Sequence, residues 1–416
     1  MKENYNFNAL FINSTNQSFI KRLDLDENCQ KVLDRAVDAV KEKLTPSLTE
    51  LAIAAGVDRR FAGPRYRLQG SQVYKTQNLP AYSPEQQVDV DLGVYLSASF
   101  MDTLTQNGRT IKVPAKQAAK LYFDTVDKLL RQLCKEEGWN YVEGKGKNTK
   151  CCRIDLSPEG VDAHIDVPLY AAPNDEFVKL AKALTPTFDS VAKYEAYARD
   201  DKAPQIDDEG WEELQVIVMA TREGEWTESD VQIVIQHFKD ATRKCGHPFI
   251  LRRLWRYVKA WRDYAWRDGG GPSSVLLMEA VVRILDTNVK TVVDLLNGGR
   301  DDRLLLYVFK GLTEQLNDDI IVQWGTQPEP LNTSNAEKRR EWVNMAIVCA
   351  GNLHRCFYDN FISSQQVIAL VTQPFGERIP DDVSLVKAVV GSPAIVLGTP
   401  KQQETPQSRI HRTQGA

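Results

Sequence analysis

The stretch Gln87-Val88-Asp89-Val90-Asp91-Leu92-Gly93-Val94-Tyr95-Leu96 decides the fold of this 416-residue chain. Apolar residues occupy every second position from Val88 to Leu96, which is the period of a half-buried β-strand. Asp89 and Asp91 therefore point to the same side of the strand, where like charges repel unless a cation lies between them. Mg²⁺ is usually bound through one or two carboxylates together with substrate phosphates. The pair therefore predicts a divalent metal site.

A glycine-serine turn, Gly70-Ser71, precedes the paired aspartates by about twenty residues. Such a turn exposes backbone N–H groups and a hydroxyl in a tight loop, which suits phosphate oxygens. Taken singly, both features are common, since Gly-Ser occurs in most proteins and solvated edge strands also carry carboxylates. Their combination at this spacing resembles the layout of the polymerase-β-type nucleotidyltransferases.

That layout predicts a third carboxylate on a neighbouring strand, because two-metal phosphoryl transfer needs a further metal ligand. The segment 161–169 alternates in the same way, with Asp162, His164 and Asp166 on one face. We expect Asp166 to be the third ligand. Asp162 and His164 are expected on a solvated face of the strand.

The composition is that of an ordinary globular protein, with 42% apolar and 26% charged residues and a net charge of −4. The net charge shows no global excess of basic residues that would indicate a nucleic-acid partner, and a local basic patch stays open as an alternative. The seven cysteines show no Cys-x-x-Cys spacing, which favours reduced thiols. No signal peptide and no membrane-spanning stretch are expected, so the sequence predicts a cytoplasmic protein.

The periodicities predict an α+β fold, with a small mixed sheet flanked by helices and a separate C-terminal helical lobe. A helix is expected over residues 28–44, ended by Pro46, and a second one from Pro114 to Lys135. The expected boundaries are an N-terminal helical lead-in over 1–59, a core over 60–220, the helical lobe over 221–390 and a flexible tail over 391–416.

The helical lobe carries a second polar cluster. On the helix over 251–263, Lys259 lies at the border of the apolar stripe, and Pro272-Ser273-Ser274 precedes the next helix. The two serines have two interpretations, as helix caps or as an anion site with Lys259 as a point charge on a triphosphate. The residue types alone leave both open. Three arginines of the same helix are expected on a solvated or surface-binding face, namely Arg252, Arg253 and Arg256.

Several motifs in order give the chain a clear resemblance to the cGAS/DncV-like nucleotidyltransferase (CD-NTase) family, closest to its bacterial cyclic GMP-AMP synthases. The motifs are Arg65–Ser71, Val88–Asp91, His164–Ala171, Lys259–Asp263, Gly270–Ser274 and Phe375–Arg378. The resemblance implies a polymerase-β-like nucleotidyltransferase core and an active site in the cleft between this core and the helical lobe.

The resemblance also implies roles for individual residues. Asp89, Asp91 and Asp166 match the catalytic, Mg²⁺-binding triad. Ser71 and Tyr74 match contacts to the triphosphate and the base, and Arg153 matches a nucleotide-contacting arginine. The full set of implied nucleotide-binding residues is Gln69, Gly70, Ser71, Gln72, Val73, Tyr74, Arg153, Lys259, Ser273 and Ser274.

The implied activity joins ATP and GTP into 3′,3′-cyclic GMP-AMP or a close relative, with two Mg²⁺ ions (Mn²⁺ as an alternative) and release of pyrophosphate. The implied setting is bacterial antiphage (CBASS) signalling, with the product read by a separate effector protein. Two alternatives stay open: another cyclic or linear oligonucleotide as product, and a catalytically silent nucleotide- or RNA-binding scaffold. The zinc-binding insertion of the animal enzyme has no matching His and Cys spacing, so no DNA requirement is expected.

The tail gives a separate hypothesis. It ends in Thr413-Gln414-Gly415-Ala416, and bacterial relatives encoded beside ubiquitin-ligase-like partners are thought to be conjugated through such a terminus. Ala416 would then be activated and joined to a target amine. A frayed end is the alternative interpretation.

Overall fold

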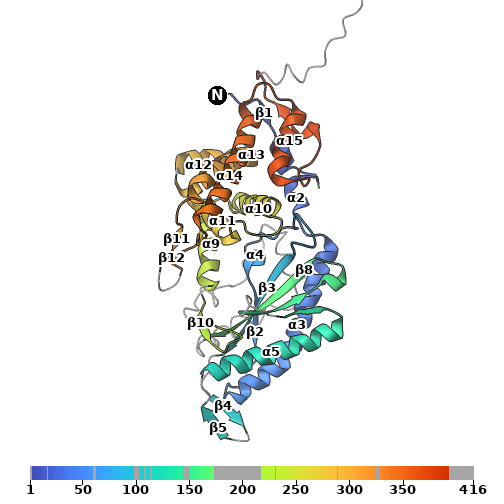
Figure 1. The fold of residues 1–416 in the computed structure, drawn as a ribbon, viewed down its shortest axis with the longest axis vertical. Helices are drawn as coiled ribbons and strands as arrows, with labels where there is room; N and C mark the ends of the chain where they lie inside the picture. Colours follow the sequence, from blue (N-terminus) through green and yellow to red (C-terminus); the bar gives the residue numbers. More distant parts are fainter. Residues whose placement is uncertain are drawn as a thin grey trace, which may run out of the picture.

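The computed structural model describes residues 2–15, 17–59, 62–97, 103–106, 109–112, 115–143, 150–172, 217–229, 231–287, 289–324 and 328–392. Within them the chain forms two lobes, a sheet with flanking helices and a helical lobe (Figure 1). The expected tail over 391–416 falls outside the described residues except for Gly391 and Ser392, and so does the conjugation terminus, Ala416.

A mixed sheet with seven strands forms the first lobe, in the order β10-β9-β8-β3-β2, with β7 beside β8 and β6 beside β7. The two long central strands, β3 and β8, are parallel, and their neighbours are antiparallel. The strands are β2 (Arg65–Leu68), β3 (Val88–Ser97), β6 (Asn140–Val142), β7 (Cys151–Asp155), β8 (Ala163–Ala172), β9 (Val218–Ala220) and β10 (Trp226–Glu228). A separate hairpin joins β4 (Thr103–Gln106) to β5 (Arg109–Lys112).

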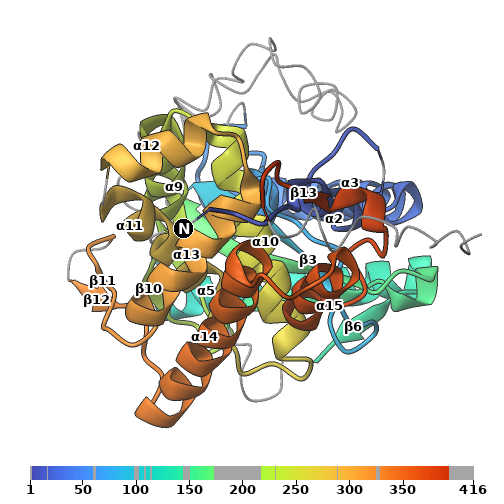
Figure 2. The ribbon, with the colours of Figure 1, turned by 90° about the horizontal axis from the view of Figure 1, so that it is seen from above.

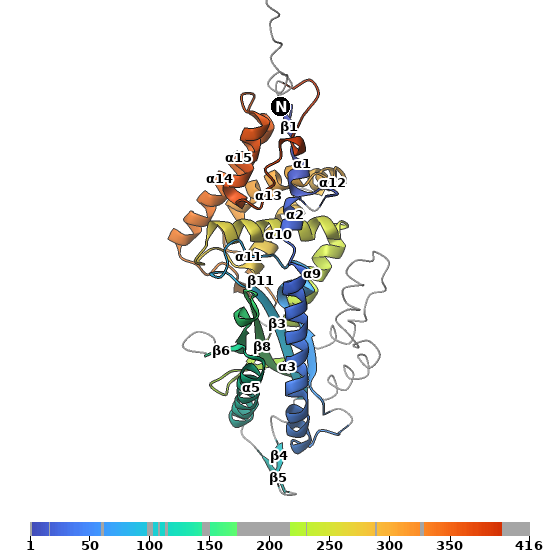
Figure 3. The same ribbon diagram turned by 90° about the vertical axis from the view of Figure 1, so that its right-hand side faces the viewer.

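Two long helices, α3 (Glu27–Ala54) and α5 (Ala115–Glu137), contribute apolar residues to the core under the sheet and lie beside it (Figure 3). The prediction that the first of them ends at Pro46 is wrong, because Pro46 lies inside α3. A proline within a helix costs about 3 kcal/mol. The buried face of α3 continues past it through Leu48 and Ala52, and that packing offsets the cost.

The helical lobe has one continuous apolar core, and α10, which carries Lys259, lies on the side of this lobe nearest the sheet (Figure 1). A short hairpin of β11 (Ile321–Val322) and β12 (Glu329–Pro330) projects from it. The helices are α9 (Val231–Cys245), α10 (Pro248–Ala265), α11 (Ser274–Thr287), α12 (Val289–Asn297), α13 (Asp301–Gln315), α14 (Ala336–Tyr358) and α15 (Ser364–Phe375).

The sequence predicts a single N-terminal helical unit over residues 1–59. In the structure this segment divides, and its first part packs into the helical lobe. Strand β1 (Tyr5–Asn6) pairs with β13 (Lys387–Ala388), and helices α1 (Asn8–Phe11) and α2 (Phe19–Arg22) add buried side chains to the core of that lobe (Figure 2). Of the elements described within residues 1–59, α3 alone packs on the sheet. In the part of the chain that the structure describes, no helix has the length and apolar character needed to cross a membrane.

Candidate active site

The acidic cluster is built by the register of the two parallel central strands. Asp91 on β3 lies opposite Asp166 on β8, and Asp89 lies opposite His164. Asp166 and His164 are each 9% exposed, so the expectation that His164 lies on a solvated face is wrong. Ligand atoms of Asp89, His164 and Asp166 all lie within 4.8 Å of one another. This separation is small enough for one divalent ion to contact all three groups.

The surroundings of Asp91 disfavour its ionised form. Burial and the nearby charges of Asp89 and Asp166 together raise the pKa of its carboxyl to about 7. Three acidic groups that converge in a partly buried site destabilise one another's ionised forms. A bound cation would remove this penalty, so the donor set fits the divalent metal that the sequence predicts.

The glycine-serine turn is fitted directly against this cluster. It forms the single helical turn α4 (Gly70–Val73), and Gly70 has a left-handed φ of +58°. A Cβ at position 70 would lie 2.3 Å from Oδ2 of Asp91, so only glycine allows this approach. The backbone N–H of Gln69 also donates to the carbonyl of Asp91 at 2.9 Å. The turn and strand β3, which carries Asp89 and Asp91, therefore pack as one unit.

The side chains of the turn divide into two groups. Ser71, Gln72 and Val73 are partly exposed. The Gln69 amide instead donates to the Tyr95 hydroxyl at 2.7 Å, in a buried network. In this conformation Gln69 thus links the turn to Tyr95 on β3.

Tyr74, expected at a base pocket, makes contact with the other lobe. Its ring meets that of Phe238 on α9 edge-on, with the centroids 5.2 Å apart. Burial raises the pKa of its hydroxyl far above the ordinary value. The turn is therefore anchored on one side to the sheet and on the other to the helical lobe.

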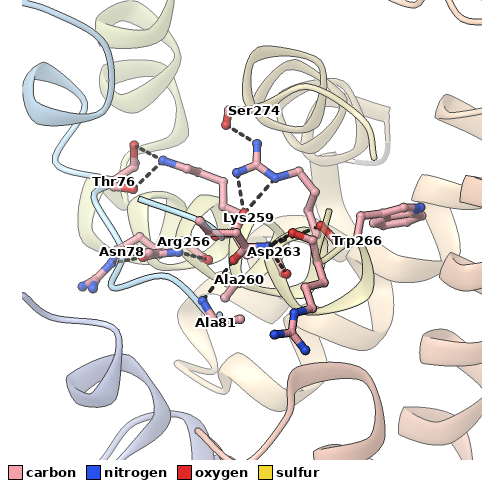
Figure 4. A network of polar contacts seen from close by, with 12 residues as sticks. Thr76, Asn78, Ala81, Arg256, Lys259, Ala260, Asp263, Trp266 and Ser274 are labelled. Carbon is pink, nitrogen blue, oxygen red and sulfur yellow. Dashed lines mark hydrogen bonds and ion pairs between the residues drawn. The ribbon is translucent and has the colours of Figure 1, made fainter. Parts of the chain in front are cut away.

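Lys259 reaches from α10 to the segment that follows the turn (Figure 4). Its Nζ donates to the carbonyl of Thr76 at 2.6 Å, and the Thr76 N–H donates to the carbonyl of Ser71 at 2.8 Å. The side chain is buried, and burial lowers the pKa of its ammonium to about 8. Lys259 therefore places a cation of the helical lobe next to the turn, as the anion-site interpretation requires.

The two serines before α11 differ in role. Ser273 accepts a hydrogen bond from the Leu276 N–H at 3.1 Å, which is a capping contact. The Ser274 hydroxyl accepts from the Arg262 guanidinium at 2.5 Å (Figure 4). Ser273 thus caps α11 in this conformation, whereas Ser274 pairs with a side chain, and triphosphate binding by either serine stays a prediction.

The arginines of α10 that were expected on a solvated face are mostly paired. Arg253 donates to both oxygens of the buried Asp301, at 2.6 and 2.8 Å. Arg256 bonds Asp24 at 2.8 Å and Asn78 at 2.9 Å. For these two the expectation is wrong, since their partners lie on segments distant in sequence.

A strap of residues 75–87 joins the two lobes, a connection that no sequence pattern predicted. Along it Tyr82 stacks on Tyr264, with the ring centroids 5.7 Å apart. At its end, the Gln86 amide donates to the carbonyl of Asp263 at 2.7 Å, and to those of Trp266 and Arg267 at 3.3 and 3.2 Å. The strap thus holds the C-terminal end of α10 next to the start of β3.

Arg153 on β7 faces the cluster from the next strand. Its guanidinium donates two hydrogen bonds of 2.6 Å, one to each carboxylate oxygen of Asp166. In this conformation Arg153 neutralises an acidic group of the cluster, and the nucleotide contact expected of it stays a prediction.

This protein is a nucleotidyltransferase of the polymerase-β type. The class is defined by the mixed sheet, the acidic cluster on its two central strands and the turn packed against that cluster. Two family models match the chain: "Cyclic GMP-AMP synthase DncV-like, nucleotidyltransferase domain" over residues 64–170 and "Cyclic GMP-AMP synthase, C-terminal domain" over residues 249–388. The chain belongs to the DncV-like nucleotidyltransferase family.

Named relatives agree with this assignment. A cyclic GMP-AMP synthase of Escherichia coli is 30% identical over 351 residues, which are 82% of this chain and 73% of that protein. A cyclic GMP-AMP synthase of Vibrio cholerae is 37% identical over 238 residues, and this alignment spans only 50% of that protein. The apo crystal structure of Vibrio cholerae DncV superposes with a TM-score of 0.68 at 22% identity, over 93% of this chain and all of that one. This likeness shows the fold.

Proposed function

We propose that this protein joins ATP and GTP into a cyclic dinucleotide, 3′,3′-cyclic GMP-AMP or a close relative, with release of two pyrophosphates. The observation that carries the proposal is the close approach of Gly70 to Asp91, which sets the glycine-serine turn directly against the acidic cluster. The names of the relatives support the product class. A Vibrio cholerae structure that holds the linear intermediate 5′ pppA(3′,5′)pG, matched at a TM-score of 0.65, supports a two-step reaction.

Asp89, Asp91 and Asp166 would hold the divalent ions, Mg²⁺ or alternatively Mn²⁺. When bound, such ions lower the pKa of a ribose hydroxyl and neutralise charge on the transferred phosphoryl group. The chain itself supplies position and charge. Free N–H groups of the turn, the Ser71 hydroxyl and Lys259 would bind the triphosphate from two lobes. Because phosphoryl transfer needs little beyond positioning and electrostatics, no nucleophilic side chain is required.

The test is to incubate the purified protein with Mg²⁺ and labelled nucleoside triphosphates, singly and in pairs, and to look for a phosphatase-resistant product. We expect one with ATP plus GTP, and its loss in Asp89→Asn and Asp166→Asn. Asp162→Asn is the matched control, since this aspartate lies just before β8 and should not affect the product. A wild-type protein that makes no resistant product from any pair contradicts the proposal and favours the scaffold alternative.

A different product would leave the enzyme class intact. If one nucleotide alone, or another pair, gives a resistant product, the alternative of another cyclic dinucleotide or trinucleotide replaces the cyclic GMP-AMP assignment. A phosphatase-sensitive product that depends on Asp89 would indicate a linear oligonucleotide.

The cellular role is also part of the proposal: an antiphage signal read by a separate effector, with Ala416 conjugated by a ubiquitin-ligase-like partner. Mass spectrometry on cells that express the neighbouring genes would detect Ala416 joined to an amine. Recovery of only free C-termini would sink the conjugation part and leave the synthase activity untouched.

A further inference from the structure

We propose that Nε2 of His164 is a nitrogen ligand of the metal held by Asp89 and Asp166, and that Gln87 is the residue that positions it. The inference rests on the proposed function, since it concerns the same metal site. It adds a ligand whose chemistry differs from that of the carboxylates.

The first step is the orientation of the Gln87 amide. Its Nε2 donates to Oδ1 of Asp155 at 3.2 Å. An ionised carboxylate only accepts hydrogen bonds, so the amide nitrogen must face Asp155 and the amide oxygen must face the other way. Although burial opposes it, hydrogen bonds from Ser157 and Asn140 lower the pKa of Asp155, which keeps this carboxylate ionised. The orientation of Gln87 is therefore determined by its neighbour.

The second step is the tautomer of His164. Its Nδ1 lies 3.1 Å from the Gln87 oxygen, which can only accept. Nδ1 must therefore carry the hydrogen, and in the neutral ring Nε2 is left with a free lone pair. Metal-binding histidines show the same arrangement, in which the ring nitrogen away from the metal donates to a carboxylate, a carbonyl or a water.

The third step is the surroundings of Nε2. His164 is buried, with 9% of the residue and 11% of its side chain exposed, and among the described residues Nε2 has no hydrogen-bond partner. It lies 3.0 Å from Oδ1 of Asp89, but not in hydrogen-bond geometry. A buried lone pair close to two carboxylates is repelled by both of them. A divalent ion between the three groups would turn each repulsion into a ligand bond.

A nitrogen ligand changes which ion the site favours. Mg²⁺ takes oxygen ligands almost exclusively, whereas imidazole suits first-row transition metals, and Mn²⁺ also accepts carboxylates. We therefore expect this position to bind Mn²⁺ more tightly than Mg²⁺, with His164 responsible for much of the difference.

Electron spin-echo spectroscopy of Mn²⁺ added to protein labelled with ¹⁵N-histidine tests the proposal directly. We expect a ¹⁵N coupling in the wild type, its loss in His164→Gln, and its retention in His354→Gln, the control on α14. The Mn²⁺ dissociation constant should rise by about tenfold or more in His164→Gln, in line with the usual effect of disturbing a metal site. Mg²⁺ affinity, measured by competition, should change much less.

Gln87 has its own pair of variants. Gln87→Met leaves His164 in place without its acceptor, so we expect a weaker coupling and Mn²⁺ binding several-fold weaker. Gln87→Glu keeps an acceptor on Nδ1 and should restore the coupling. An unchanged coupling in Gln87→Met overturns the positioning role, and this comparison holds even if His164→Gln folds poorly.

The outcomes separate this inference from the proposed function. Mn²⁺ that binds in an Asp89-dependent manner without any ¹⁵N coupling overturns the nitrogen ligand, and His164 is then a charge partner of Asp89. The proposed function would survive that result. If no ion binds in an Asp89-dependent manner, both the inference and the metal chemistry of the proposed function fail.

Discussion

Arg153 holds both carboxylate oxygens of Asp166 through two hydrogen bonds of 2.6 Å, so an arginine occupies the oxygens that a metal ion would use. The hydrogen bonds to Asp166 and the nearby negative charges raise the pKa of this guanidinium above its already high value, so it stays charged at any working pH. Metal binding by Asp166 must therefore compete with a permanent cation. The same competition would release Arg153 toward a nucleotide phosphate.

The first prediction concerns this competition. Arg153→Met should increase Mg²⁺ or Mn²⁺ affinity several-fold in the absence of nucleotide, because a competing charge is removed, and should lower turnover. Isothermal titration gives the affinity, and Arg131→Met, on an outer face of α5, is the control. Weaker metal binding in Arg153→Met would mean that the arginine orients Asp166 for the metal and does not block it.

The second prediction concerns Gly70. Gly70→Ala should reduce activity by about a hundredfold or more, since a displacement of about 1 Å at a reacting centre has this effect. Gly56→Ala is the matched control: Gly56 has a φ of +85°, yet a Cβ there would meet nothing within 4 Å. Equal loss of activity in both variants would assign the effect to backbone strain, and the contact with Asp91 would then be unimportant.

The third prediction concerns Asp91 in metal-free buffer. Because its folded-state pKa is raised to about 7, the native state binds more protons than the unfolded state between about pH 4 and 7. Stability contributed by this group is therefore present at low pH and is lost as the pH rises through 7. With EDTA at pH 8, Asp91→Asn should be more stable than the wild type by on the order of 1–3 kcal/mol.

Thermal or urea unfolding measures this difference, and Mg²⁺ provides the internal control. Added Mg²⁺ should stabilise the wild type and have little effect on Asp91→Asn, because the variant lacks one ligand. A variant that is less stable than the wild type in EDTA would contradict the electrostatic account of the site.

The fourth prediction concerns Lys259. Its pKa is lowered to about 8 by burial, so the ammonium is charged below that pH and loses its charge above it. If it binds the triphosphate, kcat/KM should fall about tenfold per pH unit above 8, while kcat should fall only at higher pH, because a bound phosphate stabilises the charge. Initial rates from pH 6.5 to 9.5 at low and saturating nucleotide test this.

Lys259→Arg serves as the comparison, since a guanidinium stays charged throughout that range. The decline in kcat/KM should be absent in this variant, even if its activity is lower overall. A decline of the same size in both proteins would place the titrating group elsewhere.

Much of the site follows from local sequence. The alternation around Asp89 and Asp91 reports directly which side chains share a face, because the period of a strand is two. The same rule located Asp166. The turn at Gly70 was found from its residue types, and the role of its glycine became specific only when the structure placed Asp91 against it.

The remaining features depend on contacts between distant segments, which no local pattern reports. His164 alternates with apolar residues like an exposed residue, and its burial comes from the strands on either side of β8. Pro46 is tolerated because of tertiary packing along α3. The partners of Arg253 and Arg256 lie 48 and more than 170 residues away in the chain.

The strap ends in two adjacent glutamines that face different lobes. Gln86 holds three carbonyls at the end of α10, and Gln87 touches His164 beside the acidic cluster. A single peptide unit, about 3.8 Å between Cα atoms, therefore separates the anchor of the helix that carries Lys259 from the strand that carries Asp89 and Asp91. If the lobes rock against each other during the two transfers, this peptide is the pivot. Close to it, even a large rotation would move the metal ligands by very little.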